Sequence, residues 1–364
     1  MRHALILAGG SGTRLWPMSR ARLPKQLIPF IGGRSLLELS YDRLDGLFAR
    51  ERRYVCAAEQ QRASTLAALP GLASERFLGE PTGRDTLNAI GLSTAVIARQ
   101  DPEAVIAVFT ADHIIAPVEE FQRVIEQGLG LVERSPETLV TFGVSPTGPR
   151  TCYGYLELGA SIDNGAFLVR QFREKPETDD ALAYFEAGCE RYLWNSGMFV
   201  WRAATLLECI QRYEPAVHAG LLEIAGAWGS ARQEETLARV YPMLKRISVD
   251  FAVMEPAARD PEVRVAALPM ALDWLDVGSW PAFARTCPQD ADGNALAAAR
   301  HLLLETKRTL VASSDPKHLI ATVGCEDLIV IHTPEATLVC HSDQAETIKQ
   351  LHQMLGERFG DECL

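Results

Sequence analysis

The chain has 364 residues, with 36 Lys and Arg against 47 Asp and Glu, a formal net charge of −11, and 47% hydrophobic residues. This composition is typical of globular proteins and argues against disorder, collagen and coiled coil, and the length allows one large domain with a smaller one. The acidic excess argues against a general nucleic-acid binder or a membrane-surface protein, because both usually need a basic face.

The charge is uneven at the N-terminus. The first acidic residue is Glu38, and the basic residues before it are Arg2, Arg14, Arg20, Arg22, Lys25 and Arg34. A short basic segment on an acidic protein suggests a small anionic ligand. The first apolar run is too short for a signal peptide or a membrane span, and the eight cysteines form no Cys-x-x-Cys pair, so we expect a reduced, cytoplasmic protein.

Apolar runs with strand character alternate with amphipathic segments through the first half of the chain. The predicted strands are 4–8, 54–57, 104–109 and 139–142, and the predicted helices are 35–48, 86–99 and 117–133. Ser35 and Glu38 form a capping box at the start of the first helix. This alternation predicts a mainly parallel sheet covered by helices, with ligands bound beyond the carboxyl ends of its strands.

The second half changes character twice. A hairpin is expected over 155–172 with its turn at 163–165, followed by helical segments over 180–241 and a mixed stretch to 283. Beyond a charged, Gly-containing run at 288–294, the predicted strands are 309–313, 319–323, 328–332 and 336–340, and the predicted helix is 344–355. We therefore predict two domains, 1–287 and 288–364.

A glycine-rich loop follows the first strand, with the sequence Leu7-Ala8-Gly9-Gly10-Ser11-Gly12-Thr13-Arg14-Leu15. Its glycines let backbone N–H groups approach a ligand closely, and Arg14 and Lys25 supply fixed positive charge for phosphate oxygens. The loop fits neither GxxxxGK[ST] nor GxGxxG, so a Walker P-loop and a dinucleotide-binding turn are disfavoured.

This loop, with Pro17 and the later Pro24-Lys25, resembles the signature of the sugar-nucleotide pyrophosphorylases. The continuations at 16–20 and 24–26 are similar to those of the bacterial mannose-1-phosphate guanylyltransferases. The resemblance implies a Rossmann-like mixed, mainly parallel sheet flanked by helices, with a small C-terminal β-rich, β-helix-like domain. Larger relatives append a cupin-type isomerase domain, and we expect that second activity to be absent here.

A second motif runs from Gly79 to Asn88, after a strand and into a helix. A carboxylate can accept paired hydrogen bonds from guanine N1–H and its exocyclic amine, whereas adenine offers no such donor pair. The resemblance implies that Glu80 is the base-reading acid. Asp85, Leu87 and Asn88 depart from the family pattern, and Asp85 also suits the N-terminus of a helix.

Two aspartates are candidates for a metal. Asp112 follows an apolar strand, and Asp276 precedes Val277-Gly278 in a turn. Mg²⁺ prefers one or two carboxylates with substrate phosphates and water. The resemblance implies that Asp112 and Asp276 hold Mg²⁺, with Mn²⁺ left open, and that His113 packs or orients the loop.

Three further motifs resemble the family's sugar-phosphate pocket. They supply Gly154 for close backbone approach, Glu174 and Lys175 for a sugar hydroxyl and the 1-phosphate, and Asn195 for sugar hydroxyls. Cys152 replaces a glycine of the family pattern.

The resemblance implies transfer of GMP from GTP to mannose 1-phosphate, with GDP-mannose and pyrophosphate as products. The implied nucleotide-binding residues are Leu7, Ala8, Gly9, Gly10, Gly12, Thr13, Arg14, Lys25, Glu80, Arg84 and Asp112, and the implied catalytic residues are Arg14, Lys25, Asp112 and Asp276. Two alternatives stay open: a sister pyrophosphorylase with another nucleotide or sugar 1-phosphate, and a non-catalytic subunit that senses GDP-mannose. We expect a homodimer and no nucleic-acid or membrane partner.

Overall fold

The computed structural model describes residues 1–10, 12–20, 23–29 and 33–360, which form two compact units. Unit 1 comprises Met1–Gly9, Ser40–Ala111 and Ile115–Trp274, and unit 2 comprises Gly10–Leu39, Asp112–Ile114 and Leu275–Leu364. Helix α1 (Leu36–Asp42) and strands β5 (His113–Ala116) and β11 (Asp273–Asp276) run across these limits. The domain boundary at 287/288 stays a prediction, and Ser11 and Arg22 lie outside the described residues.

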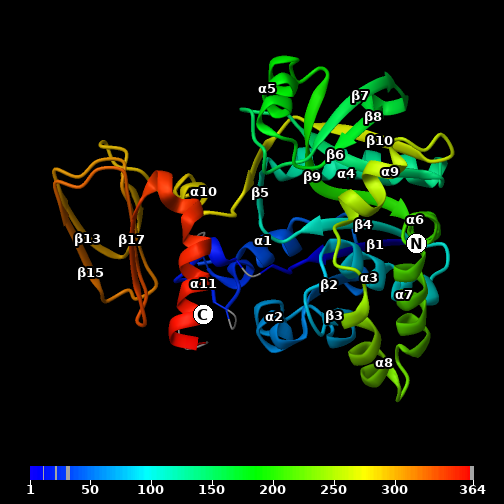
Figure 1. Cartoon of the computed structure of the whole chain (residues 1–364), viewed down its shortest axis with the longest axis horizontal. Coiled ribbons are helices and arrows are strands. Elements are labelled where there is room, and N and C mark those ends of the chain that lie inside the picture. The colour runs from blue at the N-terminus through cyan, green and yellow to red at the C-terminus, as the bar shows by residue number, and fades with distance from the viewer. Residues whose placement is uncertain (11, 21–22, 30–32, 361–364) are drawn as a thin grey trace. The chain divides into compact units, whose positions relative to one another are not determined.

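Unit 1 is built on a nine-stranded mixed sheet in the order β3-β2-β1-β4-β9-β6-β10-β8-β7 (Figure 1). Strands β3, β2, β1 and β4 are parallel, β9 is antiparallel to both β4 and β6, and β10 is parallel to β6. The strands are β1 (Arg2–Leu7), β2 (Arg53–Ala58), β3 (Phe77–Glu80), β4 (Val105–Thr110), β6 (Thr138–Val144), β7 (Tyr155–Ser161), β8 (Phe167–Arg173), β9 (Tyr192–Arg202) and β10 (Arg264–Met270). The predicted fold class and the hairpin of β7 and β8 are confirmed.

Helices flank this sheet because its central strands are apolar on both faces. Leu5 and Ile6 are consecutive in β1, so their side chains point to opposite faces of the sheet, and both are fully buried, as expected for parallel strands covered on both sides. The helices are α2 (Arg62–Ala68), α3 (Thr86–Gln100), α4 (Val118–Arg134), α5 (Thr178–Glu186), α6 (Ala203–Tyr213), α7 (Pro215–Ala227), α8 (Gln233–Val240) and α9 (Glu255–Ala257). None of the helices among the described residues is long and apolar enough to cross a membrane.

Two predictions of secondary structure are wrong in part. The helix expected over 35–48 keeps its capping box, since Ser35 N–H donates to Glu38 (2.8 Å) and Glu38 N–H to Ser35 (3.2 Å), but α1 ends at Asp42. The region expected to be helical contains β9, an eleven-residue strand. Its aromatic and apolar residues suit a buried strand, and the partners β4 and β6 are far away in sequence.

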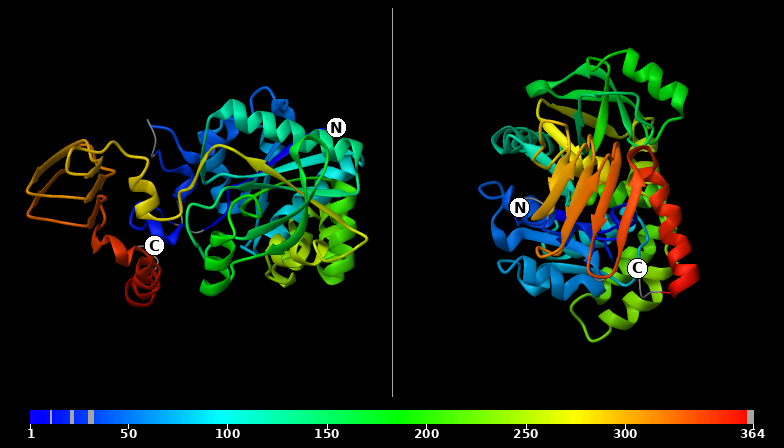
Figure 2. Two further views of the ribbon diagram at one scale, coloured as in Figure 1. Left: turned by 90° about the horizontal axis from the view of Figure 1, so that it is seen from above. Right: turned by 90° about the vertical axis from the view of Figure 1, so that its left-hand side faces the viewer.

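The C-terminal part of unit 2 consists of short strands stacked in successive turns, coloured orange to red in Figure 2. They form two sheets, in the orders β12-β14-β16-β17 and β13-β15, with parallel pairing except between β16 and β17. The strands are β12 (Ala295–Ala297), β13 (Arg300–Leu304), β14 (Leu310–Ser313), β15 (Leu319–Val323), β16 (Leu328–His332) and β17 (Thr337–His341), and the helices are α10 (Trp280–Ala284) and α11 (Ile348–Phe359). This arrangement confirms the predicted β-rich C-terminal region.

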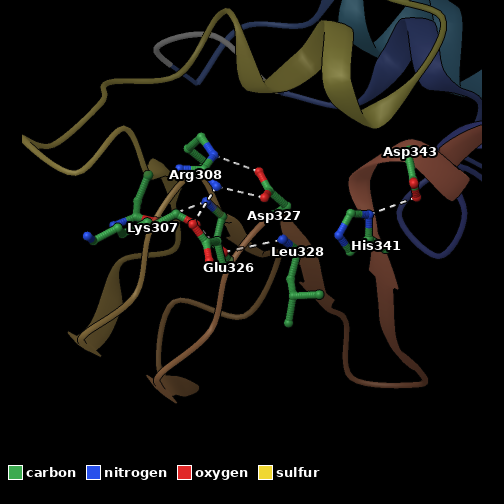
Figure 3. Close-up of polar contacts among 9 residues, drawn as sticks. Lys307, Arg308, Glu326, Asp327, Leu328, His341 and Asp343 are labelled. Carbon is green, nitrogen blue, oxygen red and sulfur yellow. Dashed lines mark hydrogen bonds and ion pairs between the residues drawn. The ribbon is translucent and has the colours of Figure 1, made fainter.

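Ion pairs and backbone bonds connect adjacent turns of this stack (Figure 3). The Arg308 guanidinium donates two bonds of 2.8 Å to the Asp327 carboxylate and also contacts Glu326. Lys307 N–H donates to Cys325 C=O at 2.9 Å. Arg308 and Asp327 both have positive φ (46° and 55°), and the bonds between them hold these two corners of the stack together.

The N-terminal segment of unit 2 shares its core with the C-terminal stack. Leu15, Trp16 and Met18 belong to one buried cluster with Trp280 and Ile329. The indole N–H of Trp280 donates to the Trp16 carbonyl at 3.0 Å. Residues 10–39 are therefore structurally part of the unit that holds the end of the chain.

Candidate functional site

Unit 2 contains the four predicted catalytic residues, Arg14, Lys25, Asp112 and Asp276. Lys25 begins the short helix η2 (Lys25–Leu27), and its ammonium donates to Asp112 Oδ2 at 2.7 Å and to the Val277 carbonyl at 3.4 Å. Val277 N–H donates in turn to the Asp112 carbonyl at 3.0 Å. This backbone bond keeps Asp112 close to Asp276, the second predicted acid, which was expected in a turn but is the last residue of β11.

Asp112, His113 and Asp276 form a group of possible metal ligands. One ligand atom from each lies within 4.8 Å of the others. Asp276 Oδ1 is buried and has no hydrogen-bond partner within the described ranges. A buried carboxylate oxygen without a donor is costly, and a divalent cation would satisfy it. His113 therefore lies within reach of the same ion, in addition to its expected packing role.

Burial and neighbouring charges move the pKa values in this group in opposite directions. Burial would lower the pKa of Lys25, but the carboxylates of Asp112 and Asp276 outweigh burial and raise it. Burial would raise the pKa of Asp112, but Lys25 and His113 hold it well below its usual range. Burial, assisted by the charge of Asp112, raises the pKa of Asp276. Lys25 therefore stays charged and pairs with Asp112. Asp276 has no such hydrogen bond from Lys25 and is repelled by the negative charge of Asp112.

Two glycines leave the space that this arrangement needs. Gly12 has φ +59°, and a Cβ there would lie 2.4 Å from Ser19 Oγ and 3.1 Å from Lys25 Cβ. A Cβ on Gly278 would lie 3.2 Å from Arg14 Nη2 and 3.3 Å from Asp276 Oδ1. A side chain at position 12 would clash with Ser19 and crowd Lys25, so Gly12 is required by packing as well as by its positive φ. A side chain at position 278 would crowd Arg14 and Asp276.

Arg14 lies in the short helix η1 (Thr13–Leu15), and its guanidinium has a partner from the C-terminal part of unit 2. Arg14 Nη1 donates to both carboxylate oxygens of Glu346 at 3.1 Å. The Arg14 side chain is 38% exposed and that of Glu346 is 72% exposed. Such an exposed pair is weak and can be exchanged for a more highly charged anion.

The predicted nucleotide-binding residues fall in both units. Leu7 ends β1, and Ala8 and Gly9 follow it in unit 1, whereas Gly10, Gly12, Thr13 and Arg14 belong to unit 2. Ala8 N–H donates to the Cys56 carbonyl at 2.8 Å, and Ala111 N–H donates to the Leu7 carbonyl at 3.0 Å. These bonds fix the start of the loop to the carboxyl ends of β2 and β4.

Glu80 lies at the end of β3 in unit 1 and is buried, with 7% of its surface exposed. The Tyr241 hydroxyl donates to Glu80 Oε1 at 2.5 Å. The other oxygen, Oε2, lies 3.8 Å from where a Cβ on Gly9 would be. Burial raises the pKa of Glu80, and the bond from Tyr241 opposes this effect. Glu80, the predicted base-reading acid, thus lies beside Gly9, and one of its carboxylate oxygens accepts a hydrogen bond from Tyr241.

The residues that depart from the family pattern after Glu80 have structural roles. Asp85 caps α3 by accepting from Thr86 N–H at 2.8 Å. Leu87 is fully buried, and the Asn88 amide donates to the carbonyls of Arg84 (2.6 Å) and Lys245 (2.8 Å). The guanidinium of Arg84 donates to the Pro242 carbonyl. This segment is therefore fastened to the chain around Pro242 and Lys245.

The predicted sugar-phosphate residues also lie together in unit 1. Lys175 Nζ is 2.7 Å from Glu174 Oε1, and a Cβ on Gly154 would lie 2.6 Å from Glu174 Oε2. Asn195 N–H donates to the Gly154 carbonyl at 2.8 Å. Burial would lower the pKa of Lys175, but Glu174 outweighs burial and raises it. The Lys175 backbone has φ +44°, a strained conformation for a residue with a side chain.

Asp250 belongs to the same group and was missed by the sequence analysis. The Asn195 amide donates to Asp250 Oδ1 at 3.0 Å, while its oxygen accepts from the Thr141 hydroxyl at 2.8 Å. Burial and the nearby charge of Glu174 raise the pKa of Asp250 to about 7. The Asn195 side chain thus positions Asp250, which belongs to no motif recognised in the sequence. The only sequence signal is a polar residue entering the apolar run 249–254.

Comparisons with known proteins agree with this organisation. A family model described as nucleotidyl transferase matches residues 3–293, and a model described as MannoseP isomerase/GMP-like beta-helix domain matches residues 299–355.

Two curated relatives and one solved structure match nearly the whole chain. The xanthan biosynthesis protein XanB of Xanthomonas campestris pv. campestris (strain B100) is 34% identical over 356 residues, which cover 95% of this chain and 72% of XanB. A mannose-1-phosphate guanylyltransferase of Escherichia coli is 33% identical over 359 residues, with 96% and 73% covered. A Thermus thermophilus structure named mannose-1-phosphate geranyltransferase has a TM-score of 0.84 and 32% identity, with 97% and 99% covered.

Proposed function

The chain belongs to the nucleotidyl transferase family, and we propose that within this family it transfers GMP from GTP to α-D-mannose 1-phosphate, giving GDP-mannose and pyrophosphate. The observation that carries this proposal is the group in unit 2, where Lys25 is bonded to Asp112 at 2.7 Å and Asp276 and Arg14 lie alongside Gly278. The name of the E. coli relative supports the choice of substrates.

The reaction needs alignment and charge neutralisation more than acid–base catalysis. A phosphate oxygen of mannose 1-phosphate attacks the α-phosphorus of GTP, and the bond from that phosphorus to the bridging β-oxygen breaks to release pyrophosphate. The nucleophile is already anionic at neutral pH, so no general base is required. Arg14 would bind the β- and γ-phosphates, and Lys25 would stabilise negative charge around the α-phosphate.

The residues present fit a magnesium ion. Asp112 and Asp276 would hold it, because both are carboxylates and the buried Oδ1 of Asp276 has no donor among the described side chains. When bound, Mg²⁺ would neutralise phosphate charge. Lys25 would then leave Asp112 to contact the substrate phosphates, and its high pKa keeps it cationic for that role.

Unit 1 would supply the base and sugar contacts. Glu80 would accept from guanine N1–H and the exocyclic amine, and Arg84, Leu7, Ala8 and Gly9 of the same unit would contribute further nucleotide contacts. Gly10, Gly12 and Thr13, which belong to unit 2, are proposed to bind the nucleotide as well. Lys175 would bind the 1-phosphate of the sugar. Glu174 and Asp250, positioned by Gly154 and Asn195, would accept from the sugar hydroxyls.

A panel of nucleotides and sugar 1-phosphates tests this proposal, with released pyrophosphate as the readout. We expect GTP with mannose 1-phosphate to be preferred over ATP, UTP and dTTP by at least about 100-fold in kcat/KM, because a buried carboxylate rejects a base without paired donors. Turnover with another pair would favour the sister pyrophosphorylase. Binding of GDP-mannose without any turnover would favour the sensing subunit.

A further inference from the structure

The hydrogen bond between Tyr241 and Glu80 joins residues 161 positions apart in the sequence. Tyr241 begins the short helix η7 (Tyr241–Met243) after α8, and Glu80 ends β3, and both segments belong to unit 1 (Figure 1). Tyr241 is fully buried and Glu80 is 7% exposed. The contact is therefore shielded from water. In such a buried environment, a hydrogen bond to a carboxylate is strong and directional.

The surroundings of Glu80 leave one side of its carboxylate for a ligand. Tyr241 holds Oε1, and the backbone N–H of Arg84 also donates to the carboxylate. Oε2 lies on the side of Gly9, 3.8 Å from the position that a Cβ on this glycine would take. The terminal torsion of a glutamate is broad and roughly two-fold, so without fixed donors the plane of the carboxylate would vary.

We propose that Tyr241 is a positioning residue for base selection: its hydroxyl fixes the plane of the Glu80 carboxylate so that the acid accepts two N–H donors from guanine at once. This inference rests on the proposed function, in which Glu80 reads the base. A fixed carboxylate gains both bonds without losing torsional freedom on binding. A carboxylate that rotates freely would keep one well-aligned hydrogen bond from guanine and lose much of the second.

The same hydroxyl favours the ionised form of Glu80 that two-donor recognition requires. Burial raises the pKa of Glu80, and the negative charge of Asp85 raises it further. The hydrogen bonds from Tyr241 and from the Arg84 N–H lower it again. The Cys56 thiol is a further titratable neighbour, and burial together with the charge of Glu80 raises its pKa, so it stays neutral. Removing the hydroxyl therefore shifts the protonation of Glu80 to higher pH.

Tyr241→Phe tests the proposal because it removes only the donor oxygen. We expect KM for GTP to rise about tenfold, in line with a lost charge-assisted hydrogen bond, with kcat within about twofold and KM for mannose 1-phosphate unchanged. The preference for GTP over ITP, which lacks the exocyclic amine, should fall by a similar factor. The acid limb of kcat/KM for GTP should move to higher pH.

Tyr213→Phe is the matched control, since Tyr213 donates to Asp260 at 2.8 Å elsewhere in unit 1. It should leave the ratio of GTP to ITP and the pH profile unchanged. Tyr241→Met, which fills the space with a flexible apolar side chain, gives a second variant without the hydroxyl should the Phe variant not fold. In a double-mutant cycle, the effect of Tyr241→Phe on the ratio should vanish when Glu80→Gln is already present.

The outcomes separate the two levels of inference. If wild-type protein does not turn over GTP, the proposed function fails whatever the variants do. If wild-type protein prefers GTP to ITP and both hydroxyl-free variants keep that preference and the same acid limb, the role of Tyr241 is wrong while the proposed function stands. If Tyr241→Phe lowers the preference for GTP over ITP equally in the wild-type and Glu80→Gln backgrounds, the positioning role of Tyr241 is also wrong.

Discussion

Lys25 donates to Asp112 Oδ2 at 2.7 Å, so the cation predicted to bind phosphate is paired with the acid predicted to bind metal. Both residues would exchange this partner when substrate and ion arrive. The pair satisfies the charges of a buried lysine and a partly buried aspartate, and in the proposed mechanism substrate and ion would take over both contacts. This relationship determines what single substitutions in unit 2 should do.

Lys25→Ala should lower kcat by roughly 10²–10³, the cost of removing one preorganised donor at the reacting centre. The variant should remain folded, because Mg²⁺ added to the buffer can neutralise the Asp112 carboxylate in place of the Lys25 ammonium. Steady-state pyrophosphate release with saturating substrates measures the effect. The control is Lys349→Ala, an exposed lysine in α11 of the same unit. Near-normal turnover of Lys25→Ala would remove Lys25 from the mechanism.

Asp276→Asn should weaken magnesium binding and, without metal, stabilise the protein. Asp276 carries a buried oxygen without a donor and lies close to the charge of Asp112, so a neutral amide relieves repulsion. We expect a higher midpoint of thermal unfolding in EDTA and a weaker stabilisation by added Mg²⁺ than in wild type. Asp273→Asn, an exposed acid of β11, is the control. Identical magnesium titrations of the two variants would contradict the assignment.

Asp250→Asn should stabilise the protein at high pH. The pKa of Asp250 is raised in the folded state to about 7, so the folded chain holds a proton that the unfolded chain has lost. This group therefore contributes stability at low pH that disappears as pH rises toward 7. The free energy of unfolding in urea should increase in the variant at pH 8, and by about half as much at pH 5.5. Asp163→Asn, at an exposed turn, should show no such difference between the two pH values.

Gly154→Ala should impair sugar binding selectively. The added Cβ would lie 2.6 Å from Glu174 Oε2, which must then move away from its present place beside Lys175. We expect KM for mannose 1-phosphate to rise about tenfold or more, the scale of a lost hydrogen bond to a charged group, with KM for GTP unchanged. Gly148→Ala is a suitable comparison, since no atom lies within 4 Å of its Cβ position. Equal changes in both KM values would point to a general loss of structure.

Local sequence signals account for much of the fold. The apolar runs of β1, β2, β4 and β6 and the Ser35–Glu38 capping box are each defined by neighbouring residues, and β15 and β16 have the predicted bounds. Strand β9 was missed because its place in the sheet depends on β4, β6 and β7, which lie elsewhere in the chain. A long helix to residue 48 was wrong because the chain turns at Gly46, where φ is +89°.

The site was predictable only where a motif marks it. Arg14, Lys25, Asp112 and Asp276 stand in recognisable strings, and the structure places all four in unit 2. Tyr241 and Asp250 carry no such mark. Tyr241 is hydrogen-bonded to Glu80, 161 positions away, and Asp250 to Asn195, 55 positions away. Contacts between such distant residues form only when the chain folds. Their roles stay predictions until the variants are measured.

The shared core of unit 2 also orders events during synthesis. Leu15, Met18 and Leu36 leave the ribosome early, but the cluster that buries them is completed by residues as late as Ile348. At roughly 5–20 residues per second, these apolar side chains wait roughly 15–60 s for their partners. The buried surroundings of Leu15, Met18 and Leu36 are therefore completed only after the residues around Ile348 have been synthesised, and a nascent chain that stalls before the C-terminal strands would leave these apolar side chains exposed.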